Sequence, residues 1–301
     1  MRRYYCIVNL FSGGGKARHI ITKIQYILLS HHIKCTVSTT SIKGATSLAK
    51  EAAAEGFTHV IAVGGDGTVN EVVNGIAGTN TALGVIPAGS GNDFARTLYS
   101  NALSLDQILE TLAQGNLKTI DLGQISSENT AGKITKKHFV NGVGIGLDAK
   151  VAYEANRFKW LPADFMYVIA ALKTIATYKS SYVSVYNQEL IDSGKQLLIA
   201  VGNGKSAGGG FYLTPNAELS DGMFDICLVK GVGILKILRI FPTVFKGKHG
   251  KFPEVKFFRT DALHVITENG LPVHIDGEIL GLHEKDIQIN LKNNALNVIS
   301  P

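Results

Sequence analysis

The sequence predicts an α/β domain followed by a β-rich domain. Through residue 123, apolar strand patterns alternate with helical patterns, and this alternation favours a doubly wound parallel sheet. Three of these strands run directly into turns rich in glycine or other small residues. After the polar segment 126–133, most patterns are those of strands joined by Gly, Asn and Asp turns, which indicates a sandwich-like domain. We therefore expect two domains, residues 1–125 and 126–301.

Short apolar runs identify the strands of the first domain, and apolar residues at helical spacing identify its helices. The expected strands are residues 4–8, 33–38, 59–63, 83–86 and 117–122, and the clearest helices are residues 44–54 and 105–112. Loops that follow neighbouring parallel strands lie at one edge of the sheet, where ligands of open α/β sheets bind.

The second domain has mostly strand patterns around one helical insert. Segment 126–133 is interpreted as a hairpin turn or a boundary loop. The expected strands are residues 139–143, 182–186, 196–201, 223–228, 262–267, 272–275, 287–291 and 295–299, and the helical insert is residues 149–178.

The composition is that of a soluble enzyme with two hydrophobic cores. The chain has 301 residues, of which 45% are hydrophobic and 18% are charged. Its three cysteines, Cys6, Cys35 and Cys227, are widely spaced, so we expect buried thiols and neither a disulfide framework nor a zinc site. No run reaches the ~20 apolar residues of a membrane span, and we expect a cytoplasmic protein.

Residues 64–71, GGDGTVNE, carry the most informative turn. Glycines allow backbone N–H groups to close around an anion, and the N-terminus of a helix adds partial positive charge. Thr68 is placed to cap the helix that follows, and Asp66 could hold Mg²⁺. The same pattern also fits an ordinary strand-to-helix corner, so this turn alone leaves both interpretations open.

Two further turns favour the phosphate-binding interpretation over an ordinary strand-to-helix corner. Residues 84–96, GVIPAGSGNDFAR, repeat the plan of apolar strand, small-residue turn and polar helix start. Residues 6–16, CIVNLFSGGGK, have a similar plan near the beginning of the chain. Three such loops at one sheet edge predict a phosphate-binding site.

These three blocks, together with residues 220–222 (SDG), 224–225 (FD) and 276–278 (DGE), resemble the diacylglycerol kinase catalytic superfamily, and most closely its soluble bacterial lipid kinases. The blocks follow the family's order and span nearly the whole chain. GGDGT by itself is shared with NAD kinases and is similar to phosphofructokinase loops. The resemblance implies an NAD kinase/phosphofructokinase-like first domain, which the final strands of the chain approach. Leu10 stands where relatives usually carry proline.

The resemblance implies that the first domain binds ATP. Thr40 and Ser90 are expected as supplementary nucleotide contacts on this ground alone. The complete expected set is Asn9, Leu10, Phe11, Ser12, Gly13, Thr40, Gly64, Gly65, Asp66, Gly67, Thr68, Asn70, Glu71 and Ser90.

Phosphoryl transfer to an alcohol needs a phosphate cradle, a divalent cation and a carboxylate near the hydroxyl group. We expect Asp66 to hold the catalytic Mg²⁺, directly or through water, and Asp93 to act beside the lipid hydroxyl or the metal. The resemblance implies that Glu278 is the proton acceptor, with Asp276 nearby. The residues alone fit a plain hairpin turn equally well.

A second cation site is implied by the resemblance only. It would be a structural Mg²⁺ held by Asp221, the backbone carbonyl of Met223 and Glu218. Without the resemblance, the sequence favours an ordinary acidic turn.

Positive charge is concentrated in one segment. The net charge is +6, and residues 230–259 contain eight Lys/Arg against a single acid, Glu254. Within it, residues 232–245 form an apolar helical pattern interleaved with Lys236 and Arg239, which fits docking on anionic lipid headgroups. A solvated helix packed on the second domain is an equal alternative. Nucleic acid is less favoured, because the aromatic residues have the pattern of core residues.

We interpret the chain as an ATP-dependent lipid kinase at the membrane surface that converts diacylglycerol to phosphatidic acid. The alternatives are an NAD kinase, a kinase for sphingoid bases, ceramide or phosphatidylglycerol, and a nucleotide-sensing protein without catalysis. The presence of Asp66, Asp93 and Glu278 argues against the last of these. Bacterial relatives suggest a homodimer.

Overall fold

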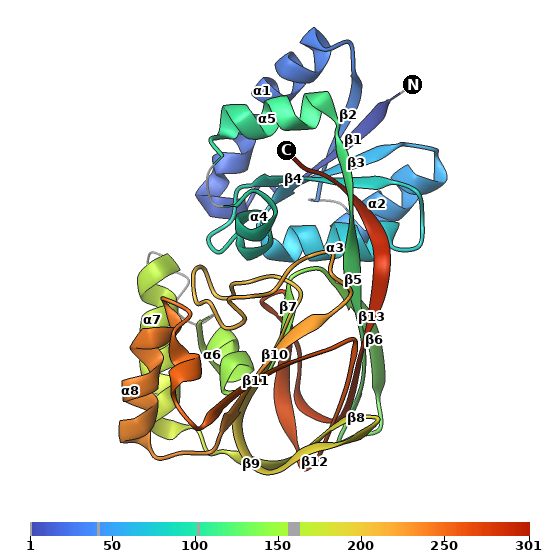
Figure 1. Cartoon of the computed structure of the whole chain (residues 1–301). Coiled ribbons are helices and arrows are strands. Elements are labelled where there is room, and N and C mark those ends of the chain that lie inside the picture. Colours follow the sequence, from blue (N-terminus) through green and yellow to red (C-terminus); the bar gives the residue numbers. More distant parts are fainter. Residues whose placement is uncertain (1, 41–42, 101–102, 156–162) are drawn as a thin grey trace. The chain divides into compact units, whose positions relative to one another are not determined.

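The computed structural model describes residues 2–40, 43–100, 103–155 and 163–301 (Figure 1). The chain divides into two compact units, which we describe separately. Unit 1 comprises Met1–Leu122 and Asn293–Pro301, and unit 2 comprises Gly123–Lys292. Both divisions fall inside long strands, because β5 (Leu117–Asn129) and β13 (Glu278–Ile299) each contribute residues to both units.

Unit 1 alternates strands and helices as predicted. Its elements are β1 (Arg3–Val8), the 3-10 turn η1 (Ser12–Gly15), α1 (Lys16–Ser30), β2 (Lys34–Thr39), α2 (Ala45–Ala54), β3 (His59–Gly64), α3 (Asp66–Ile76), β4 (Ala82–Pro87), α4 (Asp93–Leu98) and α5 (Leu105–Gln114).

The sheet of unit 1 is parallel and doubly wound. Its strand order is β4-β3-β1-β2, and the end of β13 adds a further parallel strand beside β4 through Val298 and Leu83. The chain reverses its direction across the sheet after β2. Because such crossovers are right-handed, α1 covers one face, and α2 and α3 cover the other (Figure 1). A Cβ on Gly75 would lie 2.6 Å from Ala49 Cβ, so this glycine permits close packing of α3 against α2.

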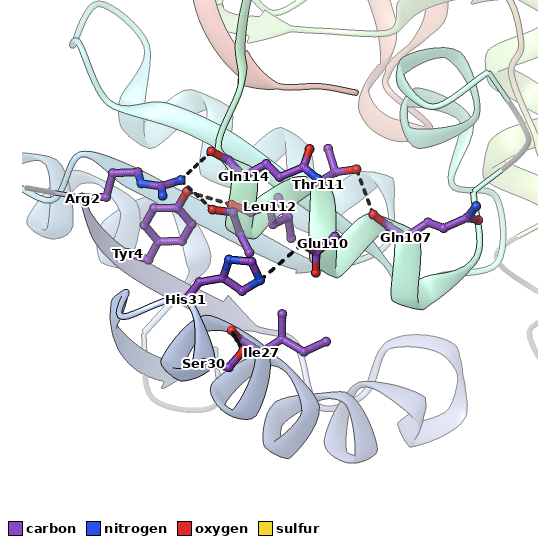
Figure 2. A network of polar contacts seen from close by, with 11 residues as sticks. Arg2, Tyr4, Ile27, Ser30, His31, Gln107, Glu110, Thr111, Leu112 and Gln114 are labelled. Carbon is purple, nitrogen blue, oxygen red and sulfur yellow. Dashed lines mark hydrogen bonds and ion pairs between the residues drawn. The ribbon is translucent and has the colours of Figure 1, made fainter.

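A polar network fixes the last turn of α5 against β1 (Figure 2). The Arg2 guanidinium donates to the carbonyls of Ala113 and Gln114, both at 2.6 Å, and the Tyr4 hydroxyl donates to the Leu112 carbonyl at 2.8 Å. Carbonyls at the end of a helix have no partner within the helix, and a cation there is also favoured by the helix dipole. This network positions the helix that precedes β5.

Unit 2 is rich in strands, and its described residues include three helices between them. Its elements are the second part of β5, then β6 (Ile134–Phe139), β7 (Gly142–Gly146), α6 (Leu147–Ala155), α7 (Ala163–Thr177), β8 (Ser181–Asn187), β9 (Glu189–Gly202), β10 (Phe224–Lys230), α8 (Ile234–Val244), the 3-10 turn η3 (His249–Lys251), β11 (Val255–Thr260), β12 (Ala262–Ile275) and the first part of β13. Among the described residues, no helix combines the length and apolarity needed to cross a bilayer.

The strands of unit 2 separate two hydrophobic cores. In β10, Ile226 and Leu228 belong to the core between strands, whereas Cys227 and Val229 belong to the core beneath the helices. Neighbouring side chains of a strand point to opposite faces of the sheet. A strand that is buried on both faces therefore has an uninterrupted run of apolar residues in its sequence. The predicted sandwich-like domain is confirmed, with a helical layer added to one face.

Several predicted boundaries were wrong. Residues 139–143 do not form one strand: β6 ends at Phe139 and β7 begins at Gly142, because the intervening backbone N–H groups bind the Asp276 carboxylate. Segment 126–133 is partly β5, and its turn is closed by the Asn129 side chain, which accepts from two backbone N–H groups at 3.0 Å. The sequence did not predict β6 and β11. The last four predicted strands belong to two long strands, β12 and β13. Part of the helical insert, residues 156–162, lies outside the described residues.

Candidate functional site

Three loops meet at the carboxyl edge of the unit 1 sheet. They follow β1, β3 and β4, which are neighbouring parallel strands. A Cβ added at Gly89 would come closer than 3.0 Å to Gly65 Cα, and one added at Gly65 would lie 3.8 Å from Ser12 Oγ. Neither of these two glycines has a positive φ, so close approach between the loops, and not backbone conformation, favours glycine at position 89. The prediction that glycine-rich turns meet at one edge is confirmed.

Asn9 organises the first loop and joins it to the second. Its backbone N–H donates to the Val63 carbonyl at 3.0 Å, and its side-chain oxygen accepts from the Phe11 backbone N–H at 3.1 Å. Its Nδ2 donates to the Thr68 hydroxyl at 3.2 Å. The predicted capping role of Thr68 was wrong: α3 begins after Gly65 without a side-chain cap, and Thr68 lies inside the helix, bound to Asn9. Asn9 thus fixes the first loop and joins it to α3.

Asn92 closes the third loop, a role that the sequence analysis missed. Its Oδ1 accepts from the Gly89 backbone N–H at 2.9 Å, and its Nδ2 donates to the Gly89 carbonyl at 2.8 Å. Asn92 adopts a positive φ of 53°, which asparagine tolerates better than most residues. Arg96 Nε also donates to the Gly91 carbonyl at 3.0 Å. Ser90 lies at the tip of this loop and is exposed.

Two carboxylates begin the helices that follow the glycine loops. Asp66 is the first residue of α3, and Asp93 is the first residue of α4. Asp66 Oδ1 accepts from the Phe94 backbone N–H at 3.3 Å, so the structure brings the two acidic turns together. Carboxylate oxygens are the protein ligands that Mg²⁺ prefers, and nucleotide phosphates supply others. The donor chemistry therefore fits Mg²⁺, although the described residues contain no preformed cluster of three or more ligands.

Other residues of the expected nucleotide set have roles in the fold. The Glu71 carboxylate accepts from the Ala45 backbone N–H at 2.7 Å, so it caps the N-terminus of α2. Asn70 is buried and accepts twice from the Asn74 amide, at 2.9 and 3.2 Å. Thr40 lies after β2, and its backbone N–H donates to the Val8 carbonyl at 3.1 Å. Phe11 and Gly13 lie in the first loop, where Phe11 is exposed.

In unit 2, Asp276 and Gly277 form a tight hairpin turn between β12 and β13. Both have a positive φ, 47° and 86°, as a type I′ turn requires. The Asp276 carboxylate is buried and accepts from three consecutive backbone N–H groups, those of Val140, Asn141 and Gly142, at 3.1, 2.9 and 2.9 Å. Asp276 thus joins the turn to the start of β7, while Glu278, the next residue but one, is exposed.

His274 supports this turn and was also missed. Its Nδ1 accepts from the Gly277 backbone N–H at 3.3 Å, and its Nε2 lies 2.9 Å from Asp148 Oδ2. An imidazole that accepts at Nδ1 carries its proton at Nε2, so His274 donates to Asp148. No local pattern could reveal this pair, because its members are 126 positions apart in the chain.

An apolar cavity lies beside this turn. Apolar side chains of α6, α7, α8, β9 and β10 form most of its lining, and Asp148, His249, His274 and Gly277 are among the remainder. Burial lowers the pKa of His249, which favours its neutral form, and its Nε2 contacts the Leu213 carbonyl at 3.2 Å. The cavity therefore fits an apolar ligand with one polar end near the hairpin turn.

The predicted structural cation site is an acidic hollow that also contains an arginine. Glu218, Asp221, Asp225 and Arg259 line it. Asp221 pairs with Arg259 and also accepts from the Met223 backbone N–H at 3.1 Å. Burial raises the pKa of Asp225, with Asp221 and Glu218 adding to the rise and Arg259 opposing it. Asp225 Oδ2 is buried without a hydrogen bond, since Arg259 Nε is 3.5 Å away. Oxygen ligands for a divalent cation are present, but Arg259 competes for them.

Comparison with known proteins identifies the family. Residues 3–125 match the diacylglycerol kinase catalytic domain, and residues 141–300 match the YegS C-terminal NAD kinase beta sandwich-like domain. A diacylglycerol kinase of Mycobacterium tuberculosis is 34% identical over 78% of this chain and 74% of its own length. The chain belongs to the diacylglycerol kinase family. A diacylglycerol kinase of Bacillus subtilis is 29% identical over 94% of this chain and 91% of its own.

Solved structures agree with the fold of this family. The alignment with a crystal structure of a diacylglycerol kinase from Bacillus anthracis covers 100% of this chain and 97% of that chain, with a TM-score of 0.74 and 24% identity. Yeast NADH kinase has a TM-score of 0.53 at 9% identity, covering 100% of this chain and 84% of its own. At these identities the likeness concerns the fold alone, so the predicted similarity to NAD kinases holds for architecture.

Proposed function

We propose that this chain transfers the γ-phosphate of ATP to the hydroxyl group of diacylglycerol, giving phosphatidic acid. Its family supports a kinase with an alcohol acceptor. The observation that carries the choice of a lipid is the apolar cavity of unit 2, whose lining includes Gly277 of the hairpin turn. Acyl chains gain free energy by leaving water for such a cavity, whereas NAD, the acceptor of NAD kinases, is polar and charged.

The proposed roles follow from the chemistry of each residue. Asn9, Gly65 and Gly89 belong to the loops that would bind the phosphates through backbone N–H groups. Mg²⁺ held near Asp66 and Asp93 would neutralise negative charge on the β- and γ-phosphates. Glu278 would accept the proton of the acceptor hydroxyl while its oxygen attacks the γ-phosphorus and ADP leaves.

The direct test is transfer of labelled γ-phosphate to a panel of detergent-dispersed acceptors. The panel contains diacylglycerol, ceramide, a sphingoid base, phosphatidylglycerol and, as a soluble acceptor, NAD. Labelled phosphatidic acid supports the proposal. Label in NADP or in another lipid product would overturn the acceptor assignment, and hydrolysis without transfer to any acceptor would overturn the kinase assignment.

A cavity variant tests whether the acyl chains enter unit 2. Ala152 is buried and lines the cavity, so Ala152→Leu would narrow it. We expect a higher KM for diacylglycerols with long chains than for those with short chains, at unchanged ATP affinity. Ala155→Leu is the matched control, because Ala155 is a buried alanine of the same helix that is outside the cavity lining. If the two variants changed the KM equally for diacylglycerols of all chain lengths, the proposal that acyl chains enter this cavity would be contradicted.

We further propose that α8 and its flanking residues dock on an anionic membrane. Ile237, Ile240 and Val244 pack into the core beneath the helices, but Leu235 is 81% exposed and Leu238 is 41% exposed. Exposed leucines beside clustered cations are typical of helices that lie in a lipid interface. Lys236 is paired with Glu254, so this lysine contributes less net charge than the sequence suggested.

Vesicle sedimentation at increasing salt tests this surface. Binding to anionic vesicles should weaken as salt screens the cations, and Arg239→Gln with Lys246→Gln should have its largest effect at low salt. Leu235→Ser should weaken binding at every salt concentration, because the apolar contribution is not screened. Equal binding to anionic and neutral vesicles would remove the electrostatic part of the proposal.

We also propose that Glu218, Asp221 and the Met223 carbonyl hold a structural Mg²⁺. Among the described residues, this hollow gathers three carboxyl groups around the single cation of Arg259, and the buried Asp225 oxygen accepts no hydrogen bond there, which supports a further cation. Mg²⁺ should raise the unfolding temperature of the wild-type protein in the absence of nucleotide. Asp221→Asn should abolish this increase, and an increase of equal size in the variant would contradict the site.

A further inference from the structure

Two cysteines far apart in the sequence meet in unit 1. Cys6 lies in β1, Cys35 lies in the adjacent strand β2, and their sulfur atoms are 3.0 Å apart. The register pairs Cys6 with Val37 and Tyr4 with Cys35, so the two side chains project from the same face of the sheet, one step apart diagonally. The sequence did not indicate this pairing, because the residues are 29 positions apart.

We propose that Cys6 and Cys35 form a reversible oxidation site, at which a peroxide converts the two thiols into a disulfide. A disulfide bond requires sulfur atoms about 2.05 Å apart, so the two sulfurs need to approach by about 1 Å. β2 is the last strand in the order β4-β3-β1-β2, and within the described residues it pairs with β1 alone. A strand with one neighbour can shift by this amount more easily than a strand held on both sides.

The two thiols differ in a way that assigns their roles. Cys6 is fully buried, whereas Cys35 is partly exposed and can meet a small oxidant. The hydrogen bond between the two sulfur atoms lowers the pKa of the Cys35 thiol, and the same contact together with burial raises the pKa of Cys6. Cys35 is therefore the thiol that reacts first, since the thiolate is the reactive form.

One molecule of hydrogen peroxide is sufficient to oxidise the two thiols to a disulfide. The Cys35 thiolate attacks a peroxide oxygen, the O–O bond breaks, and Cys35 becomes a sulfenic acid as hydroxide leaves. The Cys6 sulfur then attacks the Cys35 sulfur, the S–O bond breaks, and the proton of the Cys6 thiol leaves with the oxygen as water. In total, two thiols and one hydrogen peroxide give one disulfide and two waters. A dithiol reductant reverses the reaction by thiol–disulfide exchange.

The bridge would act on strands that lead to the candidate nucleotide loops. β1 continues into Asn9, and β2 continues into Thr40. A covalent link between these strands closes a loop of chain and reduces the conformational freedom of the unfolded state. We expect the oxidised protein to unfold at a temperature about 5 °C or more above that of the reduced protein.

The test uses the full chain treated with a small excess of hydrogen peroxide and analysed by intact mass and peptide mapping. We expect a loss of about 2 Da, a linked peptide pair containing Cys6 and Cys35, and full reversal by dithiothreitol. Cys35→Ser and Cys6→Ala should each abolish the loss. Cys227→Ala is the matched control and should retain it, because Cys227 is buried in unit 2.

Each other outcome overturns the proposal. Stable gains of oxygen at Cys35 without a linked peptide would mean that Cys6 cannot reach it. A link that involves Cys227, or dimers joined between chains, would assign the reactivity elsewhere. No change in mass at peroxide concentrations that oxidise a free thiol would show that the pair is inert. None of these readouts depends on kinase activity, so they remain informative if the proposed function fails.

Discussion

Replacing Gly89 by alanine tests whether the phosphate loops need direct backbone contact. The added Cβ would lie closer than 3.0 Å to Gly65 Cα and 3.1 Å from Gly65 N, and both of these are backbone atoms. Ordinary contact begins at 3.4 Å, so the loops after β3 and β4 would have to separate. Overpacking of this kind costs about 1–3 kcal/mol of stability. A displacement of roughly 1 Å in a site lowers the rate by about a hundredfold.

Two further glycines provide a graded series. An added Cβ would lie 3.2 Å from Gly89 Cα in Gly65→Ala, and 3.7 Å from Glu71 Oε2 in Gly44→Ala. We expect the loss of transfer rate and of Mg-ATP affinity to be largest in Gly89→Ala, smaller in Gly65→Ala and nearly absent in Gly44→Ala. Labelled phosphate transfer, calorimetric ATP binding and urea unfolding measure the three quantities. Wild-type affinity and stability in Gly89→Ala would refute the argument that space selects glycine here.

Three other predictions address single side chains. Asp66→Asn and Glu278→Gln should each reduce phosphate transfer at least ~100-fold with the unfolding temperature unchanged, and retained transfer in both would remove the proposed mechanism. Asp276→Ala should lower the free energy of unfolding by about 2–4 kcal/mol in urea titrations, because three backbone N–H groups lose their acceptor. Burial lowers the pKa of His59 from 6.5 to about 4, with Arg2 contributing, so the unfolded state takes up the proton first as the pH falls. Stability should therefore decrease from pH 6.5 to 4, and less so in His59→Gln; identical pH profiles would contradict this.

The sequence predicted unit 1 well because its signals are local. Each strand is a short apolar run, and each glycine turn follows directly, so strand positions agree with the structure to within one or two residues at most ends. Thr68 shows the limit of local reasoning. Its place near a helix start predicts a cap, but Asn9, 59 residues earlier, binds its hydroxyl. Glu71 likewise belongs to the GGDGTVNE block and yet caps α2, because α2 and α3 pack together.

In unit 2, the misplaced elements share a physical cause. The break between β6 and β7 depends on Asp276, which is 136 positions from Val140. β12 and β13 run through polar and glycine residues that resemble turns, such as Asn269 and Gly270, and register shifts in β12 accommodate them. Strand pairing between distant segments overrides local propensity at these points. The Asp148–His274 contact and the Cys6–Cys35 contact are hidden from the sequence for the same reason.

In the DGE triplet, residues 276–278, a catalytic role and a structural role have to be considered separately for each acid. Asp276 and Glu278 are both acids in one motif, and the sequence alone gives no reason to assign them different roles. The fold uses the Asp276 carboxylate to bind three backbone N–H groups and buries it, whereas Glu278 at the start of β13 is exposed. A buried carboxylate whose oxygens accept from three backbone N–H groups serves to hold the backbone in place. We therefore propose Glu278 as the proton acceptor, whereas Asp276 and His274, which accepts from the Gly277 backbone N–H, hold the turn in position.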